Sequence, residues 1–351
     1  HAATMVTAGV YLIARLGNLF TQSTVAMLAV AAVGTITLLY AGFSALTQRD
    51  IKRVLAYSTI SQIGYMFLAL GVGAWLPATF HFVMHAFFKA LLFLSSGVVV
   101  DGQNHEHDIF KMGGLWRALP VAFWTFLIGA ASLSALPFIT AGFYSKEAIL
   151  GAVGTSSLGA RWMFAGGLLG SFLTAAYTFR AVFVTFFGRQ QIEVTKRPGA
   201  FITFSLVVLS VLSIIGFVGW PMLDLSVSTE QVSVTVSSVL VLIGIGSAFV
   251  YFRNRQFSEA VSRSVFGRAL HSLSFSGFGF DWIYEHSLVI PLKTIARVNK
   301  GDVIDLFYTG LARVARAGEY ACNLLQTGRV RNYAAGLVVG AIIIAFIMAV
   351  R

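Results

Sequence analysis

Three ionisable residues lie inside one strongly apolar stretch of the sequence. His81, His85 and Lys89 are four positions apart and belong to a hydrophobic run from Pro77 to Val100. On an α-helix this spacing places the three side chains in one stripe, which extends roughly 12 Å at a rise of about 1.5 Å per residue. A cation in the hydrocarbon core is costly, so ionisable residues in membrane helices are candidates for function.

A second lysine is expected inside the membrane. Lys146 and Glu147 are the only charged residues of the stretch 120–151, which is longer than the roughly 20 residues that cross a bilayer. Pro137 and Gly142 interrupt it, which predicts a helix broken near the membrane centre with Lys146 in its outer half. Such helices expose backbone groups to polar cavities in ion transporters. A plain proline kink in a tilted helix is the alternative.

These residue types are suited to moving protons. Burial disfavours the charged form of a lysine and a nearby carboxylate favours it, while histidine titrates near neutrality and relays protons between such sites. The pattern therefore predicts a proton path through Lys89, His85, His81 and Lys146, with water filling the gaps.

Other roles for these residues stay open. His81 and His85 also have the spacing of a metal-binding pair, although neither a carboxylate nor a thiol accompanies them in the span. Lys89 could instead form a structural pair with a carboxylate outside this sequence. The run 105–108 (His-Glu-His-Asp) could chelate an ion or form a solvated loop.

The composition is that of a polytopic membrane protein. The 351 residues are 57% hydrophobic and only 11% charged, and the mean hydropathy is +0.80, whereas soluble domains carry about 25% charged residues. The net charge of +11 comes from residues between hydrophobic runs, which indicates contact with lipid headgroups and argues against nucleic acid. Cys322 is the single cysteine, so an intrachain disulfide is excluded and iron–sulfur or thiolate zinc sites are unsupported.

The hydrophobic runs predict an all-α, polytopic transmembrane helix bundle with about nine spans, one of them broken. The predicted spans are 1–14, 25–47, 54–73, 77–100, 120–152, 162–187, 200–220, 232–252 and 333–350.

The charges of the connections predict an orientation. One alternating set of connections carries twelve basic residues, whereas the other carries only Arg15 and Arg161. By the positive-inside rule the first set is cytoplasmic. Its loops are 48–53, 101–119, 188–199 and 253–280, and its basic residues are Arg49, Lys52, Arg53, Lys111, Arg117, Arg189, Lys196, Arg197, Arg253, Arg255, Arg263 and Arg268. Arg180, near the inner end of its span, is expected to extend its side chain to the interface.

The region 281–332 reads as neither a span nor an ordinary loop. Its apolar clusters alternate with charges, seven basic and five acidic over 281–331, which predicts a long lateral amphipathic helix along the membrane surface. Pro291 and Gly301 could bend or split it. The predicted domains are thus 1–252, the translocating part; 253–280, a cytoplasmic connector; 281–332, the lateral helix; and 333–351, the terminal span.

Four runs of the sequence carry a family resemblance: 1–12, 50–65, 81–97 and 133–147. They resemble the antiporter-like subunits of respiratory complex I, the proton-pumping NADH:quinone oxidoreductase. The amphipathic stretch and the last span resemble the lateral and terminal helices of the distal, L-type members of that family (mitochondrial subunit 5 type).

The resemblance implies roles for five residues. Lys89 matches the central lysine and Lys146 the lysine of the broken helix, assigned to the outer exit. His1, His81 and His85 match relay histidines. It also implies a C-terminal fragment that begins in the eighth helix and lacks the first half-channel with its glutamate–lysine pair. NAD, FMN, the iron–sulfur clusters and quinone belong to partner subunits, so no cofactor is expected in this chain.

The expected function is proton translocation, as a subunit of that translocase in a bacterial inner (plasma) membrane. The expected partners are other complex I membrane subunits, contacted by the lateral helix, and the lipid bilayer. One alternative is a subunit of a multisubunit cation/proton antiporter; the end of the sequence at Arg351, after a single span, favours complex I. The other is mainly a structural clamp of the membrane arm, which polar residues within four spans argue against as a sole role.

Overall fold

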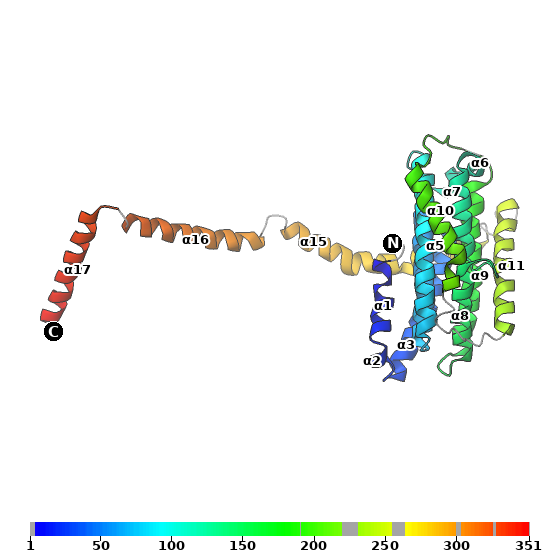
Figure 1. Cartoon of the computed structure of the whole chain (residues 1–351), viewed down its shortest axis with the longest axis horizontal. Coiled ribbons are helices and arrows are strands. Elements are labelled where there is room, and N and C mark those ends of the chain that lie inside the picture. The colour runs from blue at the N-terminus through cyan, green and yellow to red at the C-terminus, as the bar shows by residue number, and fades with distance from the viewer. Residues whose placement is uncertain are drawn as a thin grey trace. The chain divides into compact units, whose positions relative to one another are not determined.

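A computed structural model describes residues 4–189, 191–219, 231–254, 264–299, 303–325 and 328–350. The chain divides into two compact units, His1–Asp281 and Trp282–Arg351. All regular elements in these ranges are helices (Figure 1), and the only pairing of the β type is an isolated bridge between Asp50 and Asp108. The predicted all-α class is confirmed.

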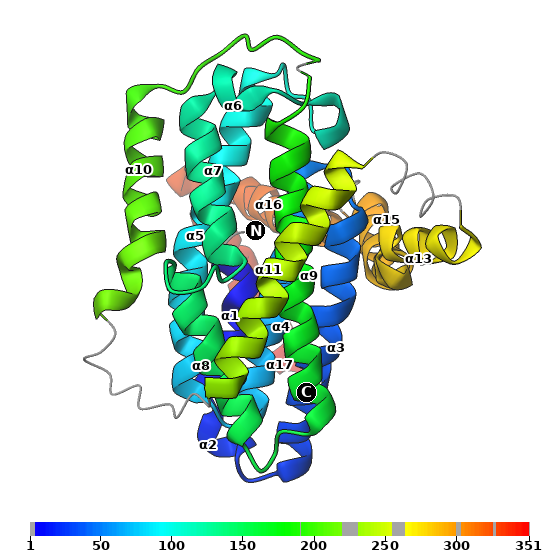
Figure 2. The ribbon, with the colours of Figure 1, turned by 90° about the vertical axis from the view of Figure 1, so that its right-hand side faces the viewer.

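The first unit is a bundle of long helices that run side by side (Figure 2). They are α3 (Thr24–Thr47), α4 (Ile51–Gly71), α5 (Trp75–Gly102), α9 (Arg161–Phe186), α10 (Ala200–Ile215) and α11 (Gln231–Arg253). Most of α4 and α9 is buried, whereas α10 and α11 expose mainly apolar side chains. An exposed surface of this kind is suited to contact with lipid.

Seven helices of the described ranges are long and apolar enough to cross a membrane. They correspond to seven of the nine predicted spans. The other two predicted spans are 1–14, of which residues 4–14 are described, and 120–152, and both contain only shorter helices in their described parts. The shorter helices of the unit are η1 (Met5–Thr7), α1 (Ala8–Arg15), α2 (Gly17–Phe20), η2 (Ile109–Lys111), α6 (Leu115–Ala118), α7 (Pro120–Leu133), α8 (Ala141–Thr155), η3 (Gly216–Gly219), α13 (Val265–Phe275) and η5 (Gly277–Gly279).

The segment 120–152 is interrupted between α7 and α8. Ala135, two residues past the end of α7, has a positive φ of 58°, and its amide donates to the Ser132 carbonyl at 3.1 Å. The next amide, that of Leu136, donates to the Ala131 carbonyl at 2.9 Å. This is the Schellman closure of a helix, with alanine at the position that glycine usually takes. Pro137 follows and cannot resume the helix, so the interruption starts earlier than the proline itself suggested.

Gly142 allows α8 to start directly against the end of α7. A Cβ atom at this position would lie 1.8 Å from the carbonyl oxygen of Ser132. The Gly142 amide donates to the Ser132 hydroxyl at 3.2 Å. The two half-helices therefore meet backbone to backbone, which only glycine permits here.

Close helix packing also places α4 against α3. A Cβ at Gly34 would lie 2.5 Å from the Leu68 amide nitrogen, and one at Gly64 would lie 2.6 Å from that of Leu38. Asp50 begins α4 by accepting from the amides of Lys52 and Arg53 at 2.7 and 3.1 Å, as an N-cap residue does. The polar side chains of α4 are thereby held inside the bundle.

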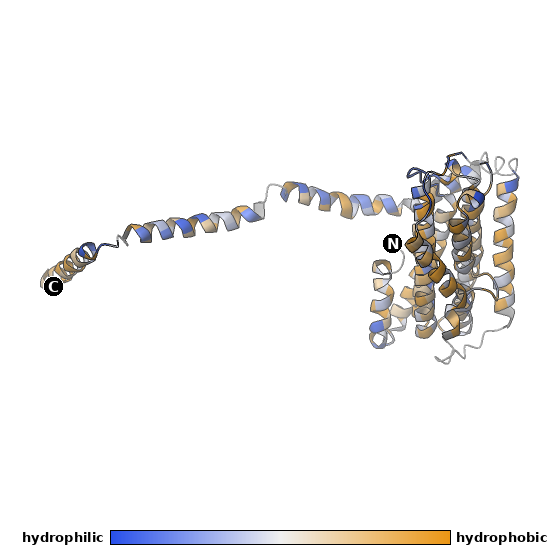
Figure 3. Cartoon of the chain, turned by 45° about the horizontal axis from the view of Figure 1, so that its top comes forward, coloured by the Kyte–Doolittle hydropathy of each residue, from blue (hydrophilic) through white to orange (hydrophobic). Residues whose placement is uncertain are grey.

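The remaining helices are α14 (Phe280–Tyr284), α15 (Ile290–Val298), α16 (Val303–Leu325) and α17 (Val330–Val350). Hydrophilic and hydrophobic residues are interspersed along α15 and α16, while α17 is largely hydrophobic (Figure 3). Pro291 does not split the helix, because a π-helical turn at Glu285–Val289 precedes it and relieves the missing backbone hydrogen bond. Gly301 lies outside the described residues.

Candidate functional site

Lys89 lies within α5 and is fully buried against α4. Its Nζ atom donates to the Leu55 carbonyl at 3.0 Å and to the hydroxyl of Ser58. The ring of Phe93 lies 6.0 Å from the same Nζ. The surroundings thus provide neutral dipoles for the amine, and no carboxylate from the described ranges pairs with it.

His85 occupies the next turn of α5 and is also fully buried. Its ring centroid is 5.4 Å from that of Phe88 and 6.2 Å from that of His81. Neither ring nitrogen has a hydrogen-bond partner among the described residues. Buried polar atoms of this kind are uncommon in folded proteins and are usual candidates for contact with water.

His81 belongs to a series of hydrogen bonds whose direction is fixed from one end. The Thr174 hydroxyl donates to the Gly170 carbonyl at 2.7 Å, so its oxygen accepts from the Gln62 amide nitrogen at 3.4 Å. The Gln62 oxygen then faces His81 Nε2 at 3.2 Å and can only accept. Neutral His81 therefore carries its hydrogen on Nε2, and Nδ1 accepts from the Ser145 hydroxyl at 2.9 Å.

The Ser145 hydroxyl has two possible acceptors. One is His81 Nδ1, and the other is the Gly142 carbonyl in the first turn of α8, 3.2 Å away. A hydroxyl carries one hydrogen, so it donates fully to only one of them at a time. The protonation state of His81 and the orientation of this hydroxyl are therefore linked.

Lys146 follows Ser145 in α8 and is also buried. Its Nζ donates to the carbonyl of Leu133, the last residue of α7, at 3.2 Å. The same Nζ lies 5.0 Å from the centroid of the Tyr65 ring. Carbonyls at a helix C-terminus lack helical partners and carry partial negative charge, so the interruption supplies an electrostatic partner for this cation.

Glu147 follows Lys146 and contacts α11. One oxygen, Oε1, accepts from the hydroxyl of Ser237 on α11. The other, Oε2, has no hydrogen-bond partner among the residues described. A buried carboxylate with a free oxygen next to Lys146 extends the site toward α11.

The run 105–108 is held by ion pairs and backbone amides. Glu106 pairs with Lys111 at 3.2 Å and accepts from the amides of His107 and Asp108, both at 2.9 Å. The Asp108 amide and then Lys111 hold the pKa of the Glu106 carboxyl below its usual value. Asp108 pairs with Arg49 at 2.8 Å. Within the described ranges, no group of three or more histidine, cysteine or acidic residues is arranged to hold a metal ion.

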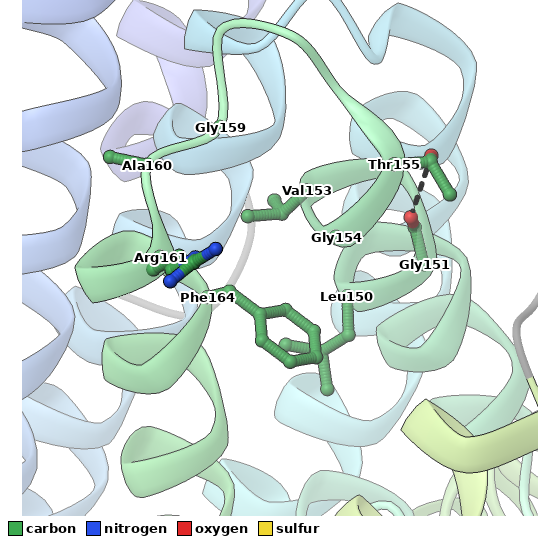
Figure 4. A pocket seen from close by; sticks show the side chains of 9 residues that line it. All are labelled: Leu150, Gly151, Val153, Gly154, Thr155, Gly159, Ala160, Arg161 and Phe164. Carbon is green, nitrogen blue, oxygen red and sulfur yellow. Dashed lines mark hydrogen bonds between the residues drawn. The ribbon is translucent and has the colours of Figure 1, made fainter.

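A separate pocket lies between the end of α8 and the start of α9 (Figure 4). Its volume is about 350 Å³, and Phe164 and Arg161 line it beside a hydrogen bond of 2.9 Å from Thr155 Oγ1 to the Gly151 carbonyl. Neither the buried lysines nor the histidines of α5 line it.

The structure places four of the five predicted residues in one buried region. His81, His85 and Lys89 lie on α5, and Lys146 reaches the region from α8. His1 lies outside the described residues.

Sequence reasoning missed most of the polar residues that connect these groups. They are Ser58, Gln62, Ser145 and Thr174. A polar residue within an apolar run was the available signal, but it does not identify the partner on another helix.

The chain is similar to known proteins over nearly its whole length. The family model described as "NADH:quinone oxidoreductase/Mrp antiporter, TM" matches residues 2–174. NADH-quinone oxidoreductase subunit L of Pseudomonas aeruginosa is 45% identical over 98% of this chain and 57% of that protein. The Escherichia coli subunit L is 43% identical over 100% of this chain and 59% of that protein. The chain therefore spans less than three fifths of the length of these relatives.

Among solved structures, the Mrp complex of a Dietzia species matches 100% of this chain and 37% of its own chain. The TM-score is 0.60 at 22% sequence identity, which shows similarity of fold. The match at 43–45% identity to subunit L over nearly the whole chain is more specific. The chain is thus a multi-pass membrane protein that carries the NADH:quinone oxidoreductase/Mrp antiporter domain over residues 2–174, and it is a homologue of NADH-quinone oxidoreductase subunit L.

Proposed function

We propose that the chain is the proton-translocating part of a membrane subunit of NADH:quinone oxidoreductase. Protons would move along Lys89, His85, His81 and Lys146, driven by redox chemistry in other subunits. The hydrogen-bond series from Gln62 through His81 to Ser145 is the observation that carries the proposal, because it joins α5 to the broken helix. The identity to subunit L supports the same function.

In this proposal a proton enters and leaves His81 at Nδ1, since Nε2 keeps its hydrogen toward Gln62. When Nδ1 is protonated it donates to Ser145, and the serine hydroxyl turns to the Gly142 carbonyl. When the proton leaves, Nδ1 passes it to the serine oxygen while the hydroxyl gives its own hydrogen to a water on the way to neutral Lys146, and the new O–H then faces Nδ1 again. The transfer thus reaches the first turn of α8, next to Lys146.

Water completes the path at His85. The centroids of the His81 and His85 rings are 6.2 Å apart, and the His85 nitrogens have no partner in the described part of the chain. A bridging water needs at least two polar partners, which these ring nitrogens and Lys89 would offer. Lys89 would then be the inner store of the proton, and Lys146 the store nearer the outer side.

The arrangement in the membrane is part of the proposal. Nine spans, with 120–152 broken, place the basic loops in the cytoplasm of a bacterium and the protein in its inner membrane. Residues 1–252 form the translocating domain, 253–280 the connector, 281–332 the lateral helix and 333–351 the terminal span. Apolar side chains exposed along α15 and α16 support a lateral helix that contacts other membrane subunits. NAD, FMN, iron–sulfur clusters and quinone would be bound by partners.

A subunit of a cation/proton antiporter is the second candidate. The family model includes both classes, and the solved Mrp complex has the same fold. The identity of 45% to subunit L, against 22% to the Mrp chain, favours the oxidoreductase. A clamp formed by 281–332 is compatible with either function.

Alanine substitutions of the two lysines in the full-length subunit test the path. Lys89→Ala and Lys146→Ala should lower the protons pumped per NADH oxidised, because each removes a buried proton carrier, while the assembled complex remains intact. Lys52→Ala, at an exposed lysine, is the control. Pumping by both variants at the control rate would refute the path, and purification without flavin and iron–sulfur subunits would favour the antiporter.

A further inference from the structure

A groove of about 630 Å³ lies between α3, α9, α11 and α13 of the first unit. This volume falls within the roughly 300–1,000 Å³ typical of small-molecule sites. Most of its walls are apolar. The apolar residues include Phe43, Leu46, Phe172, Ala176, Ala248 and Leu270.

Two guanidinium groups lie at one end of this groove. Arg49 and Arg180 both face the ring of Phe110, with their Cζ atoms 5.3 and 5.9 Å from its centroid. One carboxylate neutralises part of their positive charge, because Asp108 pairs with Arg49 at 2.8 Å. The end of the groove therefore holds a net positive charge.

Arg180 is the unusual member of this pair. Its side chain is only 6% exposed, and it donates to the carbonyl of Gln48. Its Nε has no hydrogen-bond partner among the described residues, and no carboxylate of the described ranges pairs with it. A buried guanidinium without a counter-charge is costly. An anion bound in the groove would remove that cost.

The other side of the groove is suited to lipid. Gln48 donates to the carbonyl of Phe275 at 3.1 Å and so holds α13 against α3. Tyr251 of α11 lines the groove, and Val250 of α11 and Leu273 of α13 are further exposed apolar residues of the same helices. Basic pockets between membrane helices on the cytoplasmic side bind anionic headgroups.

We propose that this groove binds an anionic phospholipid, with its phosphodiester at Arg180 and Arg49 and one acyl chain between α9, α11 and α13. The charge at one end and the apolar walls together select this class. A zwitterionic lipid would bring its own cation to the guanidinium groups, and a free phosphate would leave the apolar walls uncovered. The inference does not depend on the proton path.

The test uses the full-length protein, purified gently with its native partners and exchanged into nanodiscs of phosphatidylcholine with or without phosphatidylglycerol. Mass spectrometry of retained lipid should show preferential retention of phosphatidylglycerol. Arg180→Gln should weaken that retention about tenfold or more, because a charge-assisted contact is lost. Ala248→Trp, which fills the groove, should act in the same direction. Arg117→Gln is the control, since Arg117 also lies over an aromatic ring, 4.5 Å from Trp116, outside the groove.

Equal retention of both lipids by the unmodified protein would overturn the proposal, and this measurement does not require a variant to fold. The proposal would also be overturned if the Arg180→Gln protein retained as much phosphatidylglycerol as the Arg117→Gln control. Added inorganic phosphate tests whether the site binds a free anion or a lipid headgroup. If it displaces phosphatidylglycerol and stabilises the protein as well as the lipid does, the site binds a free anion and the lipid assignment fails.

Discussion

Removal of the Ser145 hydroxyl tests the proposed transfer between α5 and α8. In Ser145→Ala, His81 Nδ1 loses its partner at 2.9 Å, and a protonated ring would have no acceptor there. A hydrogen bond to a charged group contributes about 1.5–3 kcal/mol. Neutral His81 also loses a hydrogen bond there, worth about 0.5–1.5 kcal/mol, so the net loss for the protonated form is about 1–1.5 kcal/mol. Since 1.4 kcal/mol is about tenfold in an equilibrium, protonated His81 should become roughly 5- to 13-fold rarer.

Proton pumping should fall accordingly if His81 is an intermediate. The measurement is the number of protons moved per NADH oxidised, in proteoliposomes that contain the full-length subunit in its complex. Ser145→Thr keeps the hydroxyl and should restore pumping. Ser96→Ala is the matched control, because the Ser96 hydroxyl is buried but donates only to the Phe93 carbonyl of its own helix, at 2.8 Å.

Two results would refute this reasoning. One is a Ser145→Ala complex that pumps as well as the Ser96→Ala complex. The other is a Ser145→Thr complex that fails as Ser145→Ala does, since the loss would then come from packing and not from the hydroxyl.

Three further predictions concern stability and assembly. Gly142→Ala should destabilise the protein by about 3 kcal/mol or more, because the added Cβ would lie 1.8 Å from the Ser132 carbonyl oxygen. Gly97→Ala is the control and should be tolerated, since no atom lies within 4 Å of its added Cβ. Equal thermal stability of the two variants would contradict the close contact at Gly142. The folded-state pKa of Glu106 is lowered, so its contribution to stability is present above the usual carboxyl value of 4.5 and should be lost as the pH falls through the lower folded value. Limited pepsin digestion across that range should cut the 103–112 loop more readily as the pH falls, and Glu106→Gln should weaken this dependence; an identical profile would exclude the role. Truncation before Asp281 should reduce the amount of assembled complex on native gels, and full assembly without 281–351 would exclude a clamp.

The amino-acid sequence determined much of the architecture. Long apolar runs required membrane helices, and their residue periodicity put His81, His85 and Lys89 in one stripe of α5. Pro137 and Gly142 indicated the interruption, because each has a local backbone effect that does not depend on other helices. The Schellman closure at Ala135 was not visible, since alanine gives no sign of a left-handed conformation.

Contacts between helices required the tertiary structure. His81 and Ser145 are 64 positions apart, and Gln62 and Thr174 are 112 positions apart, so no local rule pairs them. The sequence identified Lys146 as a buried cation, but only the fold shows that the free carbonyl of Leu133 accepts from it and that Glu147 faces α11. Periodicity fixes which face of a helix is buried, whereas helix packing decides which groups meet across it, and the direction of the His81 hydrogen bonds follows from that packing.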